Sequence, residues 1–231
     1  MNRWQRLKEQ VRAGYRQLDA HNLRWAGDFG QGGGRLYCQR GCRNCCRLAV
    51  HATFTEALCV ADALTAAQRL AVAEHAAQAA AVAQVAGDLK GWLRGYRQEI
   101  GRCPLLAPDG ACGVYAERPF ACRALWSTRP ADWCGVDLAT LHPLEKQAFL
   151  SSLDRAVVAW PTHYAEAPQE AGRAAEEETL WRLRELFGFS VTGNLPYLLW
   201  LEQEIGLSTL MVQGRGAVEK VLVERKLQVP Y

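Results

Sequence analysis

The sequence contains no long apolar run. A transmembrane helix needs about 20 consecutive, mainly apolar residues, and no such segment occurs in the 231 residues. The first ten residues are rich in charged side chains and lack the apolar core of a secretory signal. We therefore expect a cytoplasmic protein that does not associate with membranes.

The sequence also lacks a large net charge and recognisable catalytic motifs. The net charge of +3 at pH 7 is too small to indicate a nucleic-acid-binding protein. The glycine-rich segment 27–34 does not match the dinucleotide fingerprint GxGxxG, and no predicted strand precedes it, so we interpret it as a flexible linker. No nucleophile–base pair, carboxylate pair or phosphate-binding loop stands out. The sequence therefore identifies no substrate and no catalytic residue.

Strand patterns are missing as well, whereas helical periodicity recurs along the chain. Thr53 and Glu56 have the spacing of a capping box, and Thr65 and Gln68 repeat it before an alanine-rich segment. We predict a mainly α fold, with little or no sheet, around an irregular cysteine-rich centre. The expected helices cover residues 2–22, 56–100 as one or two helices, a short helix opened by Pro119, 144–160, 170–187, 195–205 and 217–226.

The length fits one large domain or two small ones. We expect residues 1–135 to form a metal-binding domain that contains an N-terminal helix, the cysteine clusters and a helical insert. Residues 136–231 are expected to form a C-terminal helical region that packs on the first.

The sequence is rich in clustered cysteines. Seven of its nine cysteines form two tight groups: Cys38, Cys42, Cys45, Cys46 and then Cys103, Cys112, Cys122. In a reducing cytoplasm, such clusters are typical of metal ligands rather than disulfides. Zinc and the iron of iron–sulfur clusters typically take four thiolates. Because adjacent side chains cannot easily point at one ion, the Cys45–Cys46 pair indicates more than one simple four-cysteine ion.

The remaining cysteines and the nearby histidines need separate interpretations. Cys134 is either an eighth ligand or a loop thiol, and we include it among the candidate ligands. Cys59 lies on an apolar helical face, where core packing is the better explanation. His51 and His142 are near the clusters, but lone histidines more often form structural hydrogen bonds.

Arginines flank the cysteines throughout. Four thiolates around Zn²⁺ or around a [4Fe–4S] core leave a net charge near −2, which must be balanced by cations or N–H donors. The residues that can supply this balance are Arg40, Arg43, Arg47, Arg102, Arg118 and Arg123. The basic patch thus has an internal explanation, and it fits zinc and an iron–sulfur cluster equally well.

The spacing of Cys38, Cys42 and Cys45 also occurs in radical S-adenosylmethionine enzymes. Those enzymes carry it in a barrel of alternating strands and helices and leave one iron free. Here a fourth cysteine follows at once and the next hundred residues have helical patterns. The fold prediction therefore argues against that class.

The two groups together resemble a known family. The pattern CxxxCxxCCR, followed by CPLL, a glycine-containing turn and CxVYxxRPxxCR, resembles the YkgJ-like cysteine-cluster family of zinc- or iron-chelating domains over about residues 37–126. The resemblance implies metal chelation, as an iron–sulfur cluster in at least some members. It also implies a relation to flagellin lysine N-methylases.

Three other residues of this pattern are assigned to the surroundings of the bound cofactor: Tyr115, Arg118 and Arg123. We expect the arginines to neutralise thiolates and to pair with Glu117 or with carbonyl groups, with binding of a substrate anion as the alternative. Tyr115 is expected to pack against the cluster.

Three functions remain open at this point. The first is a metal-binding protein that holds an iron–sulfur cluster or zinc for a redox or sensing role. The second is an iron–sulfur-dependent protein-modifying enzyme. The third is a structural zinc module whose C-terminal helices contact a partner, through Trp181, Leu198, Leu199 and Trp200.

Overall fold

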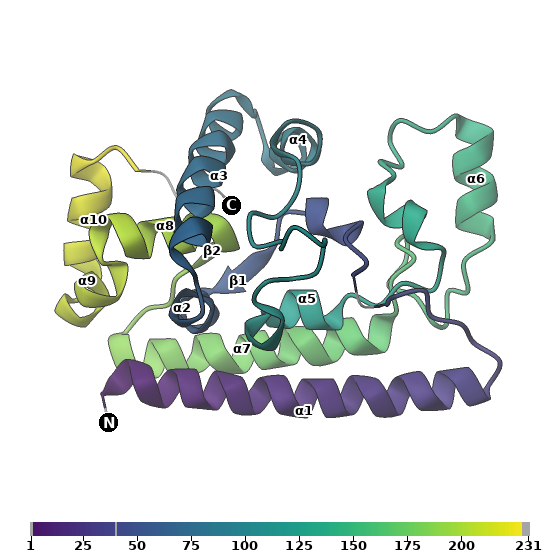
Figure 1. Cartoon of the computed structure of the whole chain (residues 1–231), viewed down its shortest axis with the longest axis horizontal. Helices are drawn as coiled ribbons and strands as arrows, with labels where there is room; N and C mark the ends of the chain where they lie inside the picture. The colour runs from purple at the N-terminus through teal and green to yellow at the C-terminus, as the bar shows by residue number, and fades with distance from the viewer. Residues whose placement is uncertain (1, 40, 228–231) are drawn as a thin grey trace.

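The chain folds into helices, with one small antiparallel strand pair (Figure 1). The computed structural model describes residues 2–39 and 41–227. Its helices are α1 (Arg3–Gln31), α2 (Phe54–Asp62), α3 (Ala66–Val85), α4 (Leu89–Gly95), α5 (Phe120–Ala124), α6 (Pro143–Ser151), α7 (Glu166–Phe187), α8 (Leu195–Ile205), α9 (Leu207–Gln213) and α10 (Arg215–Glu224). The strands are β1 (His51–Thr53) and β2 (Thr192–Asn194). The prediction of a mainly α fold is confirmed. Within the described part of the chain, no helix combines the length and the apolar character that a membrane span requires.

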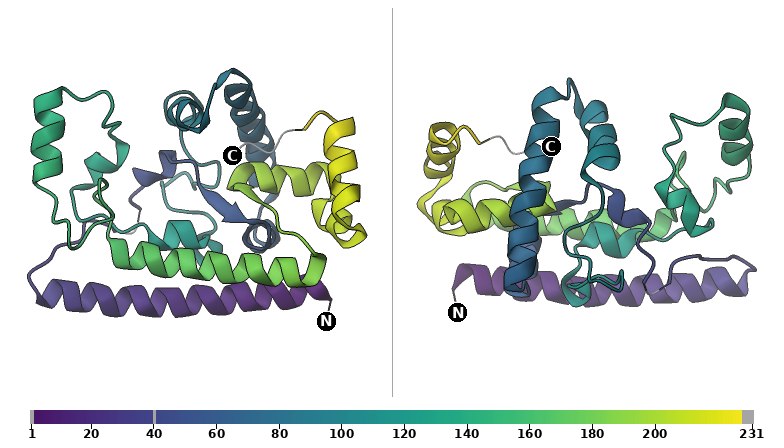
Figure 2. Two further views of the ribbon diagram at one scale, coloured as in Figure 1. Left: turned by 180° about the vertical axis from the view of Figure 1, so that it is seen from behind. Right: turned by 45° about the horizontal axis from the view of Figure 1, so that its top comes forward.

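The two longest helices, α1 and α7, lie side by side along one edge of the molecule (Figures 1 and 2). Helix α1 buries Leu7, Val11, Tyr15 and Leu18, which recur at steps of three and four residues. Of these, Val11, Tyr15 and Leu18 form a hydrophobic cluster with Phe120 of α5. The long helices thus provide the support on which α5, a cysteine-bearing helix, rests.

Helix α1 extends further than the sequence predicted. It was expected to end near residue 22, and the segment 27–34 was interpreted as a linker, but the helix continues to Gln31. Trp25 and Phe29, one turn apart, stack with their ring centroids 5.0 Å apart. Side-chain pairs at this spacing stabilise helices, which explains why the helix passes through Gly27 and Gly30.

Helix α7 carries a partly buried carboxyl group, that of Glu176. Burial is the main cause that raises its pKa to about 8, and the nearby carboxylate of Glu56 raises it further. The unfolded chain releases this proton near pH 4.5, whereas the folded protein keeps it up to about pH 8. The folded state therefore binds more protons in this range, and its stability falls as the pH rises from about 4.5 to 8.

Replacing this group gives the first prediction. Glu176→Gln removes the cost of ionising a buried carboxyl, so its Tm is expected to exceed that of the wild type at pH 8 and to differ less at pH 5. A gain of about 1 kcal/mol corresponds to about 2–4 °C in a chain of this size. Glu185→Gln, at an exposed position of the same helix that is not among the groups influencing Glu176, is the control. Thermal unfolding at the two pH values measures the effect, and equal shifts at both would contradict it.

The strand pair joins two segments that are distant in the sequence. His51, Ala52 and Thr53 pair with Asn194, Gly193 and Thr192. Helix α2 follows β1 directly, and α8 follows β2, so the strands set the relative positions of these two helices. Helices α2, α3 and α8 share the main core, in which Phe54, Leu198 and Leu199 are fully buried.

Both predicted capping boxes are confirmed. Thr53 and Glu56 close the start of α2, and Thr65 and Gln68 close the start of α3. The insert between the cysteine groups contains three helices rather than one or two. Asp88 caps α4 by accepting a hydrogen bond from the Gly91 amide at 2.6 Å. A π-helical turn at Tyr96–Ile100 then leads to Gly101, at φ +87°, and to the second cysteine group.

A separate lobe contains α6 (Figure 1). The helix predicted over residues 144–160 ends at Ser151, and Leu144, expected on its inner face, is 69% exposed. The chain turns because the Ser152 hydroxyl donates to the Phe149 carbonyl and Val158 forms a bridge with Ala165. Phe149 stacks on Trp133 at 4.0 Å, which connects this lobe to the loop that carries Cys134.

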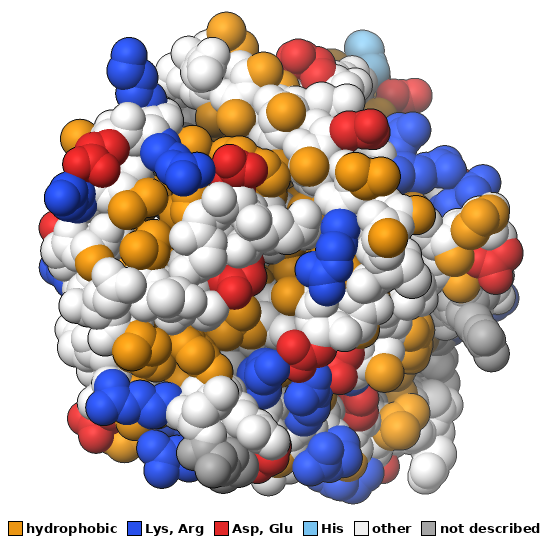
Figure 3. Space-filling model, turned by 60° about the vertical axis from the view of Figure 1, so that its left-hand side comes forward, with side chains coloured by type: hydrophobic (Ala, Val, Ile, Leu, Met, Phe, Trp, Pro, Cys, Tyr) orange, Lys and Arg blue, Asp and Glu red, His pale blue; other side chains and the backbone are white. Residues whose placement is uncertain are grey.

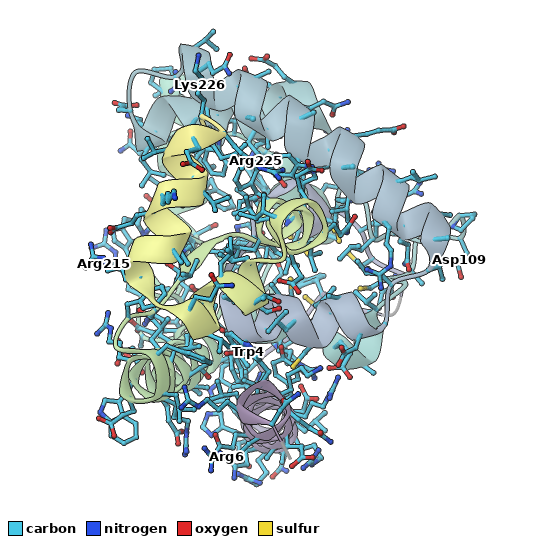
Figure 4. All side chains as sticks on the ribbon, turned by 90° about the vertical axis from the view of Figure 1, so that its left-hand side faces the viewer. Trp4, Arg6, Asp109, Arg215, Arg225 and Lys226 are labelled. Carbon is cyan, nitrogen blue, oxygen red and sulfur yellow. The ribbon has the colours of Figure 1, made fainter. Side chains whose placement is uncertain are left out.

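The C-terminal helices pack at the opposite end of the molecule. Helix α8 has the predicted bounds and ends at Gly206 in the left-handed region, at φ +61°. Helix α9 was not predicted. The Trp4 indole donates to the Ser208 carbonyl at 3.1 Å and so fastens α1 to α9 (Figure 4). Of the four residues considered for a partner surface, Leu198 and Leu199 are core residues, whereas Trp181 is 58% exposed.

The face formed by this end of the molecule carries charges of both signs. Figure 3 shows lysine and arginine side chains interspersed with acidic ones and with small hydrophobic areas. Such mixing agrees with the small net charge of the chain. This face does not present the continuous basic surface that is typical of nucleic-acid-binding proteins.

Candidate metal centre

Apart from Cys122, the clustered cysteines lie on loops and short turns that hydrogen bonds hold together. The Cys103 amide donates to the Cys46 carbonyl at 2.7 Å, which joins the two cysteine groups directly. Leu106 forms a bridge with Cys112, and Cys122 lies on α5. Figure 4 shows several sulfur atoms on the side of the molecule that carries Asp109. Segments that are far apart in the sequence therefore meet at one place.

Cys45 is at the centre of the electrostatic interactions among these thiols. Burial is the main cause that raises the pKa of Cys38 and of Cys103 to about 11, and the Cys45 thiol raises both further. Burial also raises the pKa of Cys122, with smaller contributions from Cys103, Cys45 and Cys112. The pKa of Cys45 is raised first by its hydrogen bond with Cys46 and then by burial. The thiols are thus close enough to oppose one another's ionisation.

Cys134 lies within the same neighbourhood. It is buried in the 3-10 turn Ala131–Gly135, which packs against the turn Cys45–Arg47. Burial raises its pKa, and the thiols of Cys45 and Cys42 raise it further. Its sulfur lies 3.4 Å from Nε2 of His163, a buried residue that the sequence analysis did not consider. Burial is the main cause that lowers the pKa of His163 to about 4, so its imidazole is neutral at pH 7.

The other sulfur and imidazole groups lie elsewhere or have structural roles. Cys59 is fully buried in the cluster between α1 and α2, as expected, and none of the clustered thiols influences it. His142 accepts a hydrogen bond from the Leu144 amide at 3.3 Å and so caps α6. His51 belongs to β1. No role in metal binding is indicated for these three residues.

Arg118 is a positively charged residue that favours ionisation of three of the clustered thiols. Its charge favours the thiolate form of Cys45, Cys112 and Cys122 and so opposes the rise of their pKa values. Its guanidinium lies 3.9 Å from the centre of the Tyr115 ring, and this ring is 58% exposed rather than enclosed by the cluster. In the described structure, Nε of Arg118 is buried without a hydrogen-bond partner.

Arg123 stabilises the fold around the centre. It is buried and donates to the carbonyls of Arg118 at 2.7 Å and Ala116 at 2.5 Å. The predicted bonds to carbonyls are therefore confirmed, but its acidic partner is Asp19 of α1 rather than Glu117. Glu117 pairs with Arg12 instead. Arg40, another predicted counter-charge, lies outside the described residues.

The donor set fits a metal centre. Sulfur ligands select zinc, Cu(I) and iron–sulfur clusters, and the unpaired Nε of Arg118 offers a donor to a negatively charged thiolate group. In residues 2–39 and 41–227, no three Cys, His, Asp or Glu side chains converge closely enough to hold one ion. Because cysteine binds metal as a thiolate, metal binding must displace the thiol protons. The side chains would also have to move closer together around the metal as it binds.

Substitution of Arg118 tests whether its charge stabilises the metal-bound thiolates, as distinct from the stability of the fold. Arg118→Ala is expected to weaken Zn²⁺ binding by about 10- to 100-fold, as is typical when a partner of the ligands is lost. Arg155→Ala is the control, because Arg155 also stacks on an aromatic ring, that of Trp160, at 3.9 Å, but is not among the groups that influence the thiols. Competition with a chromophoric chelator measures both affinities. Equal affinities in the two variants would contradict the assigned role.

The comparisons with known proteins agree with this chemistry. Residues 37–143 match the family model described as "CxxCxxCC: Putative zinc- or iron-chelating domain". The predicted resemblance to a cysteine-cluster chelating family is therefore confirmed for this segment, which contains all nine cysteines of the chain. No curated protein and no solved structure gives a significant match to the chain.

Proposed function

We propose that this is a cytoplasmic metal-binding protein whose clustered cysteines bind an iron–sulfur cluster or zinc as thiolates. The proposed ligands are Cys38, Cys42, Cys45, Cys46, Cys103, Cys112, Cys122 and Cys134. The observation that supports this proposal is the meeting of separate chain segments around Cys45, whose thiol influences its neighbours from both cysteine groups and from the loop of Cys134. The matched chelating domain supports metal binding in general.

The surroundings favour a redox or sensing role over a sealed structural site. As whole residues, most of the candidate ligands are not fully buried. A bound iron–sulfur cluster would supply one-electron chemistry, and its potential depends on hydrogen bonds to the sulfurs and on solvent exposure. The Ser127 amide, which donates to the Cys38 sulfur at 3.2 Å, is such a hydrogen-bond donor.

Protection of the cysteines against alkylation tests this ligand set. In the anaerobically purified full chain, the eight proposed ligands should react slowly with iodoacetamide and should become reactive together when a chelator removes the metal. Cys59 is the internal control, since its slow reaction depends on burial in the core rather than on metal. Mass spectrometry assigns the modified residues. Rapid alkylation of the eight cysteines in metal-loaded protein would contradict the proposal.

A further inference from the structure

The hydrogen bonds around the cysteines separate them into two groups. One group centres on Cys46, Cys103 and Cys112, which the Cys103–Cys46 backbone bond and the Leu106–Cys112 bridge hold together. The other contains Cys38 and Cys134, on segments that meet at Ser127 and its neighbours. The contacts around these two groups of cysteines involve different segments of the chain.

The second group is anchored to the loop that leads into α7. The Ser127 amide donates to the Cys38 sulfur at 3.2 Å, and the Ser127 carbonyl accepts from the Tyr37 amide at 2.9 Å. Ser127 also forms a bridge with Tyr164. A tight turn, in which the Cys42 amide donates to the Gln39 carbonyl at 3.1 Å, brings the segment of Cys42 back toward Cys38.

His163 projects from this loop onto the sulfur of Cys134. Its backbone carbonyl accepts from the Thr128 amide at 3.0 Å and from the Thr128 hydroxyl at 2.8 Å. Its ring packs between Phe149 and Tyr164, with centroid separations of 5.9 and 4.2 Å. Nε2 is thereby held 3.4 Å from the Cys134 sulfur. A ring fixed by its neighbours in this way has the orientation that a metal ligand needs before metal arrives.

We propose that His163 is a metal-binding residue and that, with Cys38, Cys42 and Cys134, it forms a mixed thiolate–imidazole subsite distinct from the subsite around Cys103. Three cysteines and one histidine are a common donor set for zinc. Cys45 influences thiols of both subsites. This inference rests on the proposed metal-binding function. It adds a ligand from beyond residues 37–143, the segment that matches the chelating domain.

Two substitutions of the same residue test the inference. The full chain is stripped of metal and titrated anaerobically with Co²⁺, whose visible bands report the number of thiolate ligands. We expect His163→Gln to lose about half of the bound Co²⁺ while the helical circular dichroism is retained. His163→Cys should restore the bound Co²⁺ and strengthen the thiolate-to-cobalt band, because it adds a sulfur ligand. His51→Gln, at a histidine of β1 with no assigned role in metal binding, should behave as wild type.

The outcomes separate this inference from the proposed function. If His163→Gln binds as much Co²⁺ as the wild type, with the same spectrum, the inference is overturned while the proposed function stands. If wild-type protein binds no Co²⁺, zinc or iron, the proposed function itself fails. If His163→Gln does not fold, the spectrum of His163→Cys tests the inference instead. A thiolate-to-cobalt band in His163→Cys that is no stronger than in the wild type would overturn the inference.

Discussion

Cys45→Ser is expected to cause the largest loss of metal of any single cysteine substitution. The Cys45 thiol influences those of Cys38, Cys103 and Cys134, whereas the other cysteines have narrower sets of neighbours. Loss of a partner that only orients a ligand costs roughly 10- to 100-fold in metal affinity. Removal of a ligand shared between two groups should therefore cost more than about 100-fold. Metal analysis and chelator competition on anaerobically prepared protein measure the effect.

Cys59→Ser is the matched control for this substitution. It makes the same chemical change at a fully buried cysteine that is not part of the centre. We expect it to retain the wild-type metal content and to lose about 1 kcal/mol of stability, because a hydroxyl replaces a thiol in an apolar cluster. If Cys45→Ser keeps as much metal as Cys59→Ser, Cys45 does not occupy the central position assigned to it.

Glu56→Ala is expected to destabilise the fold by about 3 kcal/mol, because each buried amide that loses its acceptor costs about 1–3 kcal/mol. The side chain is fully buried, and its two oxygens accept from the amides of Thr53 at 2.8 Å and Phe120 at 2.7 Å. Alanine leaves the Phe120 amide buried without this acceptor. Because Phe120 begins the helix that carries Cys122, metal affinity should fall as well.

The second capping box provides the control for Glu56. Gln68 occupies the same position in its box, but its bonds to Thr65 lie at the surface, and no side-chain hydrogen bond from it to a second element is found among the described residues. Gln68→Ala is expected to cost about 1 kcal/mol or less, in the usual range for a cap. Urea unfolding of metal-free protein compares the two variants. Losses of similar size would show that the bond to Phe120 adds little.

The sequence predicted the elements whose boundaries depend on local signals. Helix α8 begins and ends where Pro196 and Gly206 indicated, and Gly188 ends α7 in the left-handed region, as expected. The two capping boxes were visible because the two residues of each box lie within a single helical turn. These signals act between residues that are close in the chain, so they can be read without knowledge of the fold.

The errors arose where distant contacts decide the structure. Strand β1 exists because it pairs with β2, which lies much later in the chain, and neither segment has a strand pattern. Helix α6 ends early because Val158 forms a bridge with Ala165 rather than continuing a helix. In each case the partner was not evident from the local pattern.

The candidate site was predicted in part for the same reason. The two cysteine groups were visible as clusters, because a cysteine-rich segment is a local signal. His163 was not found, because a single histidine in a loop carries no ligand spacing, and only the fold brings it to Cys134. Arg123 illustrates a related difficulty: its acidic partner, Asp19, belongs to a helix far away in the sequence.

The most direct test of the account is the metal content and visible absorption spectrum of the anaerobically purified wild-type protein. The account predicts bound metal in stoichiometric amount: a coloured protein with iron and acid-labile sulfide, or a colourless protein with zinc. Removal of the metal by a chelator should expose the clustered thiols but not Cys59. A correctly folded protein that contains neither metal and takes up neither on reconstitution would contradict the central claim.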